Sequence, residues 1–362
     1  MNFNFFKFTS FRILLFPFSL LYGLVITIRN YLFDKKIIKS VSFNLPVIAV
    51  GNLSVGGTGK SPMVEYLLAL LQNNYKAATL SRGYKRKTKG YILANATTTA
   101  LEIGDEPMQF HQKFPEVAVA VGEERILAVP QLLQDRPETN VIILDDAFQH
   151  RSIKPGLNIL LTEYSNLFTS DFFLPSGNLR DQQSSYKRAD IIVVTKCPSD
   201  LSEKEKKKIN ESIRLLSHQS IFFTTIHYGQ PYHISTQEKK IITLNDEVLL
   251  VCGIANPKPI QKYLLQKAKK YYQQSFSDHH VFSMDDLKNI RKKFEDISAK
   301  QKIIITTEKD AVRLINFKDQ LNELPLFVLP VQHQFLFNEG IQFDRIINMF
   351  IETYVKENDK NE

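Results

Sequence analysis

The residues best suited to chemistry lie in a glycine-rich segment that reads GNLSVGGTGKS from Gly51 to Ser61. An apolar run, Leu45 to Val50, precedes this segment and predicts a strand, and a helical pattern of apolar residues begins near Pro62. In a strand, loop and helix of this order, backbone N–H groups face an anion. The segment therefore predicts a phosphate loop in which Lys60 reaches the terminal phosphates of a nucleotide and Ser61 places a hydroxyl on Mg²⁺.

The loop departs from the usual pattern at its first position, where Ser54 stands in place of glycine. Gly56 and Gly57 leave the backbone free to turn, so we interpret the segment as a variant phosphate loop rather than an ordinary turn. The residues predicted to bind the nucleotide are Ser54, Val55, Gly56, Gly57, Thr58, Gly59, Lys60 and Ser61.

Two acids follow another apolar run, Val141 to Leu144. An aspartate at the carboxyl end of a strand beside a phosphate loop holds Mg²⁺ against the β- and γ-phosphates of the nucleotide. Asp145 and Asp146, together with Ser61, are therefore the predicted magnesium ligands, the alternative being an acidic strand end at the surface. A guanine-nucleotide switch is disfavoured, because the Asp-x-x-Gly that it needs would put glycine where Phe148 stands.

A kinase also needs a group that orients or deprotonates the acceptor hydroxyl. Asp105 and Glu106 stand at a predicted helix start, but an acid followed closely by proline is also an ordinary helix-start signal. Further along the chain, Asp278-His-His280 places two histidines beside an acid, which suits either a polarised histidine or an exposed polar turn. The local sequence leaves these alternatives open.

Two basic segments could meet an anionic substrate. Ser81-Arg-Gly-Tyr-Lys-Arg86 follows a predicted strand, and Leu174-Pro-Ser-Gly-Asn-Leu-Arg180 leads to the acid Asp181. Arginine suits forked phosphate contacts, although either segment alone could be a solvated loop. RNA binding would need aromatic residues interleaved with basic ones on one sheet face, and no such face is identifiable.

Strands and helices alternate after the phosphate loop, which predicts a parallel sheet covered by helices on both faces. A polar stretch from His227 to Lys240 marks the exit from this first series, and a second series with the same alternation follows. We therefore predict an N-terminal region at 1–40, a nucleotide-binding domain at 41–228, a smaller α/β domain at 229–335 that closes the cleft, and a C-terminal helix and charged tail at 336–362.

The N-terminal region contains a run of about sixteen uncharged residues, Ile13 to Ile28, with basic residues on both sides. The run is shorter than the roughly twenty residues of a membrane-spanning helix. A secretory signal peptide is disfavoured, because no small-residue cleavage site follows and the phosphate loop belongs where ATP is. We expect a helix that enters the membrane from one side, with a buried core helix as the alternative.

The composition is that of a folded soluble protein with a basic surplus. Lys and Arg outnumber Asp and Glu by 46 to 38, a formal net charge of +8, which favours anionic partners. Two cysteines, Cys197 and Cys252, supply neither a disulfide framework nor a metal-ligand set, and so indicate a reducing compartment.

Taken together, the ordered motifs resemble the tetraacyldisaccharide 4′-kinase family of lipid A biosynthesis, over nearly the whole chain. This resemblance implies a P-loop-type three-layer α/β/α domain, a second, smaller α/β domain and an N-terminal membrane-associated helix. The motifs that carry it are Gly51-Asn-Leu-Ser-Val-Gly-Gly-Thr-Gly-Lys60, Ser81-Arg-Gly-Tyr84, Gly104-Asp-Glu-Pro107, Asp145-Asp146 with Phe148-Gln-His150, Leu174-Pro-x-Gly-x-Leu-Arg180, Asp278-His-His280 and Thr307-Glu-Lys-Asp310.

The resemblance also implies roles for single residues. Asp105 would deprotonate the hydroxyl with assistance from His279, while Arg180 would steady the transferring phosphate; the choice of His279 over His280 follows motif position. The positions implied for substrate binding are Arg82, Glu106, Gln149 and His150.

Three positions depart from the family pattern. Ser61 replaces the more usual threonine, Ala147 replaces a glycine, and Asp181 replaces a glutamate, which shortens this side chain by one methylene.

The predicted activity is transfer of the γ-phosphate of ATP, with Mg²⁺, to the 4′-hydroxyl of a tetraacyldisaccharide 1-phosphate to give lipid IVA. The expected location is the cytoplasmic face of the bacterial inner membrane, with the acylated lipid as partner and no nucleic acid or obligate protein partner. The alternative is a membrane-attached P-loop ATPase that regulates a protein partner.

Overall fold

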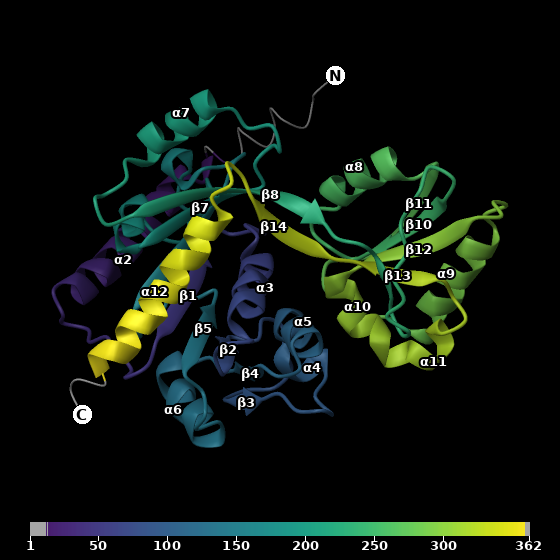
Figure 1. Cartoon of the computed structure of the whole chain (residues 1–362). Helices are drawn as coiled ribbons and strands as arrows, with labels where there is room; N and C mark the ends of the chain where they lie inside the picture. The colour runs from purple at the N-terminus through teal and green to yellow at the C-terminus, as the bar shows by residue number, and fades with distance from the viewer. Residues whose placement is uncertain (1–11, 13, 359–362) are drawn as a thin grey trace.

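The computed structural model describes residue 12 and residues 14–358. The predicted start of the apolar run at Ile13 and the end of the predicted charged tail, at 359–362, lie outside the described residues. Figure 1 shows a larger lobe and a smaller lobe, with strands β8 and β14 running from one to the other.

Among the described residues, nine strands form the sheet of the larger lobe, in the order β14-β8-β7-β6-β1-β5-β2-β4-β3. The sheet is parallel except at its two edge strands, β14 and β3. The bounds are β1 Val47–Asn52, β2 Ala77–Ser81, β3 Ile92–Leu93, β4 Ala118–Val121, β5 Val141–Asp145, β6 Leu157–Glu163, β7 Ile191–Thr195, β8 Ser220–Tyr228 and β14 Val331–Phe335.

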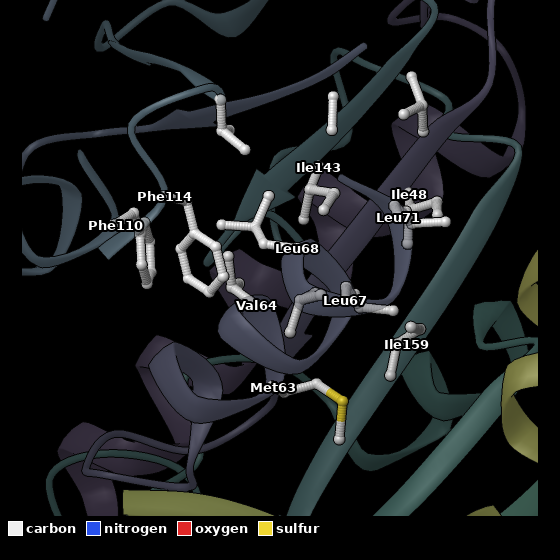
Figure 2. Packing of buried hydrophobic residues seen from close by; sticks show 14 of the residues in the cluster. Ile48, Met63, Val64, Leu67, Leu68, Leu71, Phe110, Phe114, Ile143 and Ile159 are labelled. Atoms are coloured by element: carbon white, nitrogen blue, oxygen red, sulfur yellow. The ribbon is translucent and has the colours of Figure 1, made fainter. Parts of the chain in front are cut away.

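The central strands are continuous runs of Val, Ile and Leu because both faces of the sheet are covered. Ile48 and Ile143 face α3, whose Val64, Leu67 and Leu68 are fully buried against them (Figure 2). The alternate residues of the same strands pack on the opposite face against α6 and α7. The larger lobe is thus a three-layer α/β/α domain with α3, α5 and α12 on one face.

The helices of the larger lobe include those that carry the candidate site residues. Their bounds are α2 Phe16–Asp34, α3 Lys60–Leu71, α4 Ala100–Ile103, α5 Asp105–Lys113, α6 Arg125–Asp135, α7 Glu203–Ile213 and α12 Gly340–Asn358.

The smaller lobe has its own sheet, in the order β11-β10-β12-β13-β9, parallel except for β9. Helix α8 covers one face, while α9, α10 and α11 cover the other. The bounds are β9 Tyr232–His233, β10 Glu247–Cys252, α8 Lys258–Lys267, β11 Lys270–Ser275, α9 Met284–Glu295, β12 Lys302–Thr307, α10 Glu308–Leu314, α11 Lys318–Leu321 and β13 Leu326–Leu329.

The chain returns to the larger lobe earlier than the sequence predicted. Strand β14 begins at Val331 and pairs antiparallel with β8 of the large sheet, so residues 331–335 do not belong to the sheet of the smaller lobe. The predicted end of the smaller domain, residue 335, therefore coincides with the end of β14, which belongs to the sheet of the larger lobe.

Helix α2 turns small and polar residues toward the protein and most of its large apolar residues toward the surface. Its buried residues are Ser19, Gly23 and Asn30, whereas most of its large apolar side chains are exposed. A side chain at Gly23 would collide with the ring of Phe173, so this glycine permits close approach to the lobe. The exposed residues of α2, which contradict the alternative of a buried core helix, are Phe16, Phe18, Leu20, Leu21, Leu24, Val25 and Ile28.

Candidate active site

The carboxyl ends of β1 and β5 bring the two predicted phosphate-side motifs together. These strands are parallel neighbours, with Val50 in register with Asp145. The phosphate loop leaves the end of β1, and Asp146 follows the end of β5. Ligands of open α/β sheets bind at this edge, where backbone N–H groups and helix N-termini converge.

The phosphate loop is fixed by hydrogen bonds to its backbone on both sides. Val55 donates its N–H to the carbonyl of Asn178 at 2.7 Å, and Thr195 donates its hydroxyl to the carbonyl of Thr58 at 2.9 Å. Gly59 caps α3 in the left-handed conformation, with φ of 88°. Lys60 is the first residue of this helix.

A small group of charges surrounds the Lys60 ammonium. Its Nζ lies 3.6 Å from Asp146 Oδ1 and 3.4 Å from Asn52 Oδ1. Arg180 donates to both carboxylate oxygens of Asp146, at 2.9 and 3.3 Å, and to Asn52 Oδ1 at 2.5 Å. Burial opposes ionisation of Asp146, but Lys60 and Arg180 outweigh it and lower the pKa of this carboxyl to about 2.

The neighbouring carboxyl is in a different state. Burial, and then repulsion from Asp146, raise the pKa of Asp145 to about 7. Its Oδ1 is buried and has no hydrogen-bond partner among the described residues. An orphaned carboxylate oxygen suits Mg²⁺, which binds through one or two carboxylates and otherwise through water and phosphate oxygens. Among the described residues, no group of three or more His, Cys, Asp or Glu side chains could hold a metal ion by itself.

The acceptor-side candidates meet across the two lobes. Asp105 is the first residue of α5 in the larger lobe, and His279 lies in the loop after β11 in the smaller lobe. His279 Nδ1 is 2.7 Å from Asp105 Oδ2, although 174 residues separate them. His280 instead places Nε2 3.0 Å from Asp286 and stacks on Phe276. The structure thus brings His279, rather than its neighbour, to Asp105.

Two cations of α10 complete this contact. Arg313 donates from Nε and Nη2 to the two carboxylate oxygens of Asp105, at 2.6 and 2.7 Å. Lys309 lies 3.2 Å from His279 Nε2 and 3.3 Å from Glu106. Because an ammonium can only donate, Nε2 accepts this hydrogen bond, and the ring proton is on Nδ1, directed at Asp105.

The same two helices are joined again behind the site. Lys113 of α5 lies 2.7 Å from Glu308 of α10 and 2.7 Å from Glu65 of α3. Burial, and then the nearby charge of Glu308, raise the pKa of Glu65 to about 7. The contact between α5 and α10 therefore consists of charge pairs at both ends.

The remaining predicted substrate residues lie near the phosphate side. Gln149 donates from Nε2 to the carbonyl of Asn52, and its own carbonyl accepts from Arg29 at 2.8 Å. Burial, and then the charge of Arg125, lower the pKa of His150 to about 4, so this ring is neutral. Arg82 is exposed at the end of β2.

Sequence reasoning missed Asn52, Arg125 and Arg313. Arg125 is 1% exposed and donates to the carbonyl of Gly122 at 2.9 Å, and its burial lowers its pKa to about 10. A signal for Arg313 was available, because Lys309 and Arg313 are four residues apart and share one helix face. No local pattern distinguished Asn52 or Arg125 from other polar residues at strand and helix ends.

Helix α2 is fastened to the segment that carries Arg180. Tyr22 donates its hydroxyl to the carbonyl of Arg180 at 2.9 Å, and Asn30 Nδ2 donates to Asp181 Oδ1 at 2.7 Å. Asp181 is 1% exposed and also pairs with Arg188 at 3.0 Å. These contacts give Asp181 a structural task in attaching α2.

Comparisons with known proteins agree over nearly the full length. The family model described as tetraacyldisaccharide-1-P 4′-kinase matches residues 11–351. A tetraacyldisaccharide 4′-kinase of Flavobacterium johnsoniae is 50% identical over 352 residues, which cover 96% of this chain and 98% of that protein. The protein of the same name from Bacteroides thetaiotaomicron is 45% identical, covering 96% of this chain and 94% of its own.

A solved structure has the same architecture. The crystal structure of LpxK from Aquifex aeolicus in complex with ATP superposes with a TM-score of 0.73 at 30% sequence identity. The alignment covers 94% of this chain and 99% of that one.

Proposed function

The chain belongs to the tetraacyldisaccharide 4′-kinase family, and from this membership we infer that its phosphate loop and its Asp105–His279 pair are the two halves of one phosphoryl-transfer site. The protein is an ATP-dependent kinase that phosphorylates the 4′-hydroxyl of the tetraacyldisaccharide 1-phosphate precursor of lipid A. The alternative of a regulatory ATPase is not favoured. The observation that carries the site assignment is the 2.7 Å contact between Asp105 and His279, which places a proton-accepting pair where the two lobes meet.

The phosphate half binds and neutralises. Lys60 and the backbone N–H groups around Gly59 hold the β- and γ-phosphates of ATP, and Arg180 supplies a second cation beside Asp146. Phosphoryl transfer asks mainly for positioning and charge neutralisation, which these groups provide. Arg180 must loosen its pair with Asp146 to reach the transferring group.

We propose that Ser61, Asp145 and Asp146 hold Mg²⁺ when the nucleotide binds. The orphaned Oδ1 of Asp145 supports this assignment. Bound Mg²⁺ would neutralise phosphate charge and orient the β- and γ-phosphates. The raised pKa of Asp145 agrees with this role, because a carboxyl at this buried position needs a nearby positive charge if it is to be ionised.

In the acceptor half, His279 rather than Asp105 is the better proton acceptor. Both oxygens of Asp105 already accept hydrogen bonds from Arg313, and Oδ2 also accepts from His279. Nε2 of His279 is the free basic atom once Lys309 moves aside. The 4′-hydroxyl gives its proton to Nε2, and Asp105 stabilises the imidazolium that forms.

The lipid substrate requires contact with a membrane surface, and α2 supplies it in our proposal. Exposing acyl chains to water costs about 0.8 kcal/mol per CH₂, so the enzyme must reach the lipid at the bilayer. The exposed apolar side chains of α2 suit insertion into the inner membrane from the cytoplasmic face. Among the described residues, α2 is also the one helix long and apolar enough to cross a membrane, by length and composition alone.

Label transfer tests the function. Purified protein is incubated with γ-labelled ATP and the tetraacyldisaccharide 1-phosphate in mixed micelles, and label is followed in lipid and in free phosphate. We expect label in the lipid at the 4′ position, with little release to water. Release of phosphate at the same rate with and without the lipid would contradict the proposal and favour the ATPase.

A further inference from the structure

A buried histidine that neither half of the site uses lies directly behind the phosphate loop. His333 is in β14 and is 5% exposed. Its Nε2 lies 2.9 Å from the carbonyl oxygen of Gly59, and its Nδ1 lies 2.9 Å from the hydroxyl of Thr224 in β8. The ring therefore bridges the residue before Lys60 to the strand pair that joins the lobes.

The hydrogen bonds fix the state of the ring. A carbonyl can only accept, so Nε2 carries the proton and donates to Gly59, and Nδ1 accepts from the hydroxyl of Thr224. Burial lowers the pKa of His333 to about 4, which keeps the ring neutral at the working pH of a cell. His333 thus acts as a fixed donor rather than a titrating group.

The fit between His333 and Gly59 is close. Gly59 has a left-handed backbone, and a Cβ built on it would lie 2.9 Å from His333 Cε1 and 3.0 Å from Nε2. The ring thus occupies the space that any side chain at this position would need. Glycine at 59 serves both the turn into α3 and the contact with the ring.

Strand β14 connects this contact to the smaller lobe. It follows β13 of the small sheet after the single residue Pro330, and Val331 donates its N–H to Glu308 of α10 at 3.0 Å. Helix α10 carries the two cations that meet Asp105 and His279. One short stretch of chain therefore contacts the phosphate loop at His333 and the smaller lobe at Val331.

We propose that His333 is a positioning residue of the kinase, which holds the carbonyl of Gly59 so that the loop and Lys60 are set to receive the triphosphate of ATP. The inference rests on the proposed placement of the ATP phosphates in the loop. Its specific consequence is that ATP binding depends on a donor at the Nε2 position of residue 333.

Two amide substitutions separate this role from general packing. The amide nitrogen of His333→Gln can reach the place of Nε2 and donate to Gly59, whereas the amide of His333→Asn is shorter and reaches only the place of Nδ1. We expect His333→Asn to raise the KM for ATP roughly tenfold, the effect of one buried hydrogen bond to the backbone, with the KM for the lipid unchanged. His333→Gln should stay within about twofold of the wild type.

A second variant keeps the test valid if His333→Asn does not fold. Thr224→Val removes the hydroxyl that orients the ring, and we expect the KM for ATP to rise about threefold. His227→Asn, an exposed histidine on the same strand β8, is the matched control and should change nothing. Thermal melting of every variant checks the fold.

The outcomes distinguish this inference from the proposed function. Equal effects of His333→Asn and His333→Gln, an unchanged KM for ATP in folded His333→Asn and Thr224→Val, or an equal rise in both substrate KM values would overturn the role of His333. Lys60→Ala is measured alongside. If Lys60→Ala binds ATP as tightly as the wild type does, the nucleotide is not in the loop and the proposed phosphate site itself fails.

Discussion

The phosphate loop and the Asp105–His279 pair differ in what holds them. The loop is held by hydrogen bonds with other segments of the larger lobe, at Asn178, Thr195 and His333. The pair exists only while α5 of one lobe touches α10 and the loop after β11 of the other. Nucleotide binding therefore depends on one lobe, whereas activation of the acceptor depends on contact between two.

This difference makes the two halves separable by mutation. Changes in the loop should act on ATP binding and transfer together. Changes at the contact between the lobes should slow transfer while ATP still binds.

The largest effect is expected on the phosphate side. Lys60→Ala removes the cation that meets the terminal phosphates, and we expect kcat/KM to fall by at least 10²–10³-fold together with weaker ATP binding. Label transfer and calorimetric ATP titration measure the two effects. Lys208→Ala, an exposed lysine of α7, is the control. Loss of folding in Lys60→Ala would mean that the residue supports the core rather than the nucleotide.

The acceptor side should show the opposite division. His279→Gln removes the proposed base, so we expect kcat to fall by about 10²–10³-fold with the Kd for ATP unchanged. The neighbouring His280→Gln serves as control and should retain most of its activity, because His280 contacts Asp286 instead. A larger loss in His280→Gln than in His279→Gln would reverse the assignment of the base.

Mutation of the contact between the lobes should have the next largest effect on activity. Arg313→Gln removes two charge-assisted hydrogen bonds to Asp105, and we expect kcat to fall by roughly 10- to 100-fold with little change in ATP affinity. Arg313→Lys should recover part of the loss by restoring the charge. Arg291→Gln, in the same lobe but paired with the exposed Glu323, is the control. A fall in ATP affinity as large as the fall in kcat would show that the two halves are not separable.

The smallest effect concerns the charges behind the site. The pKa of Glu65 is raised from 4.5 to about 7 in the folded state, so the folded protein binds this proton more tightly than the unfolded chain does. The resulting stabilisation is fully present below about pH 4.5 and is lost as the pH rises through about 7. Glu65→Gln should therefore show a weaker decline of the free energy of unfolding across this range.

Denaturant unfolding at several pH values measures this slope. Glu211→Gln, an exposed glutamate of α7, should keep the slope of the wild type. If Glu65→Gln declines as steeply as the wild type, Glu65 does not titrate in the contact between the lobes.

The sequence indicated which residues of the phosphate side lie close together, such as Lys60 and Asp146, because this information is local. Lys60, Ser61, Asp145 and Asp146 follow strands that are continuous apolar runs, and parallel strands bring such ends to one edge. On the acceptor side, local sequence left Asp105 and His279 as open alternatives, and only the family resemblance paired them. Asp105 and His279 lie in different lobes, and a contact between lobes leaves no periodic pattern in the sequence.

Two features of the fold also escaped the sequence. Strand β14 is five residues long, follows Pro330 and reads Val-Gln-His-Gln-Phe, with apolar residues only at its two ends, so its sequence does not indicate which sheet it joins. Helix α2 ends at Asp34, within the predicted region at 1–40, and the contacts of Arg29 with Gln149 and of Asn30 with Asp181 could not be read from its apolar pattern. In both cases the contact partner is distant in sequence.

The most direct test of the two-lobe site is a crystal structure with a non-hydrolysable ATP analogue and the tetraacyldisaccharide 1-phosphate. We expect the 4′-oxygen to lie within about 3 Å of His279 Nε2, with Lys309 displaced, and about 3–3.5 Å from the γ-phosphorus of an analogue bound at Lys60. A 4′-oxygen that meets the γ-phosphate while the smaller lobe and His279 remain distant would contradict it.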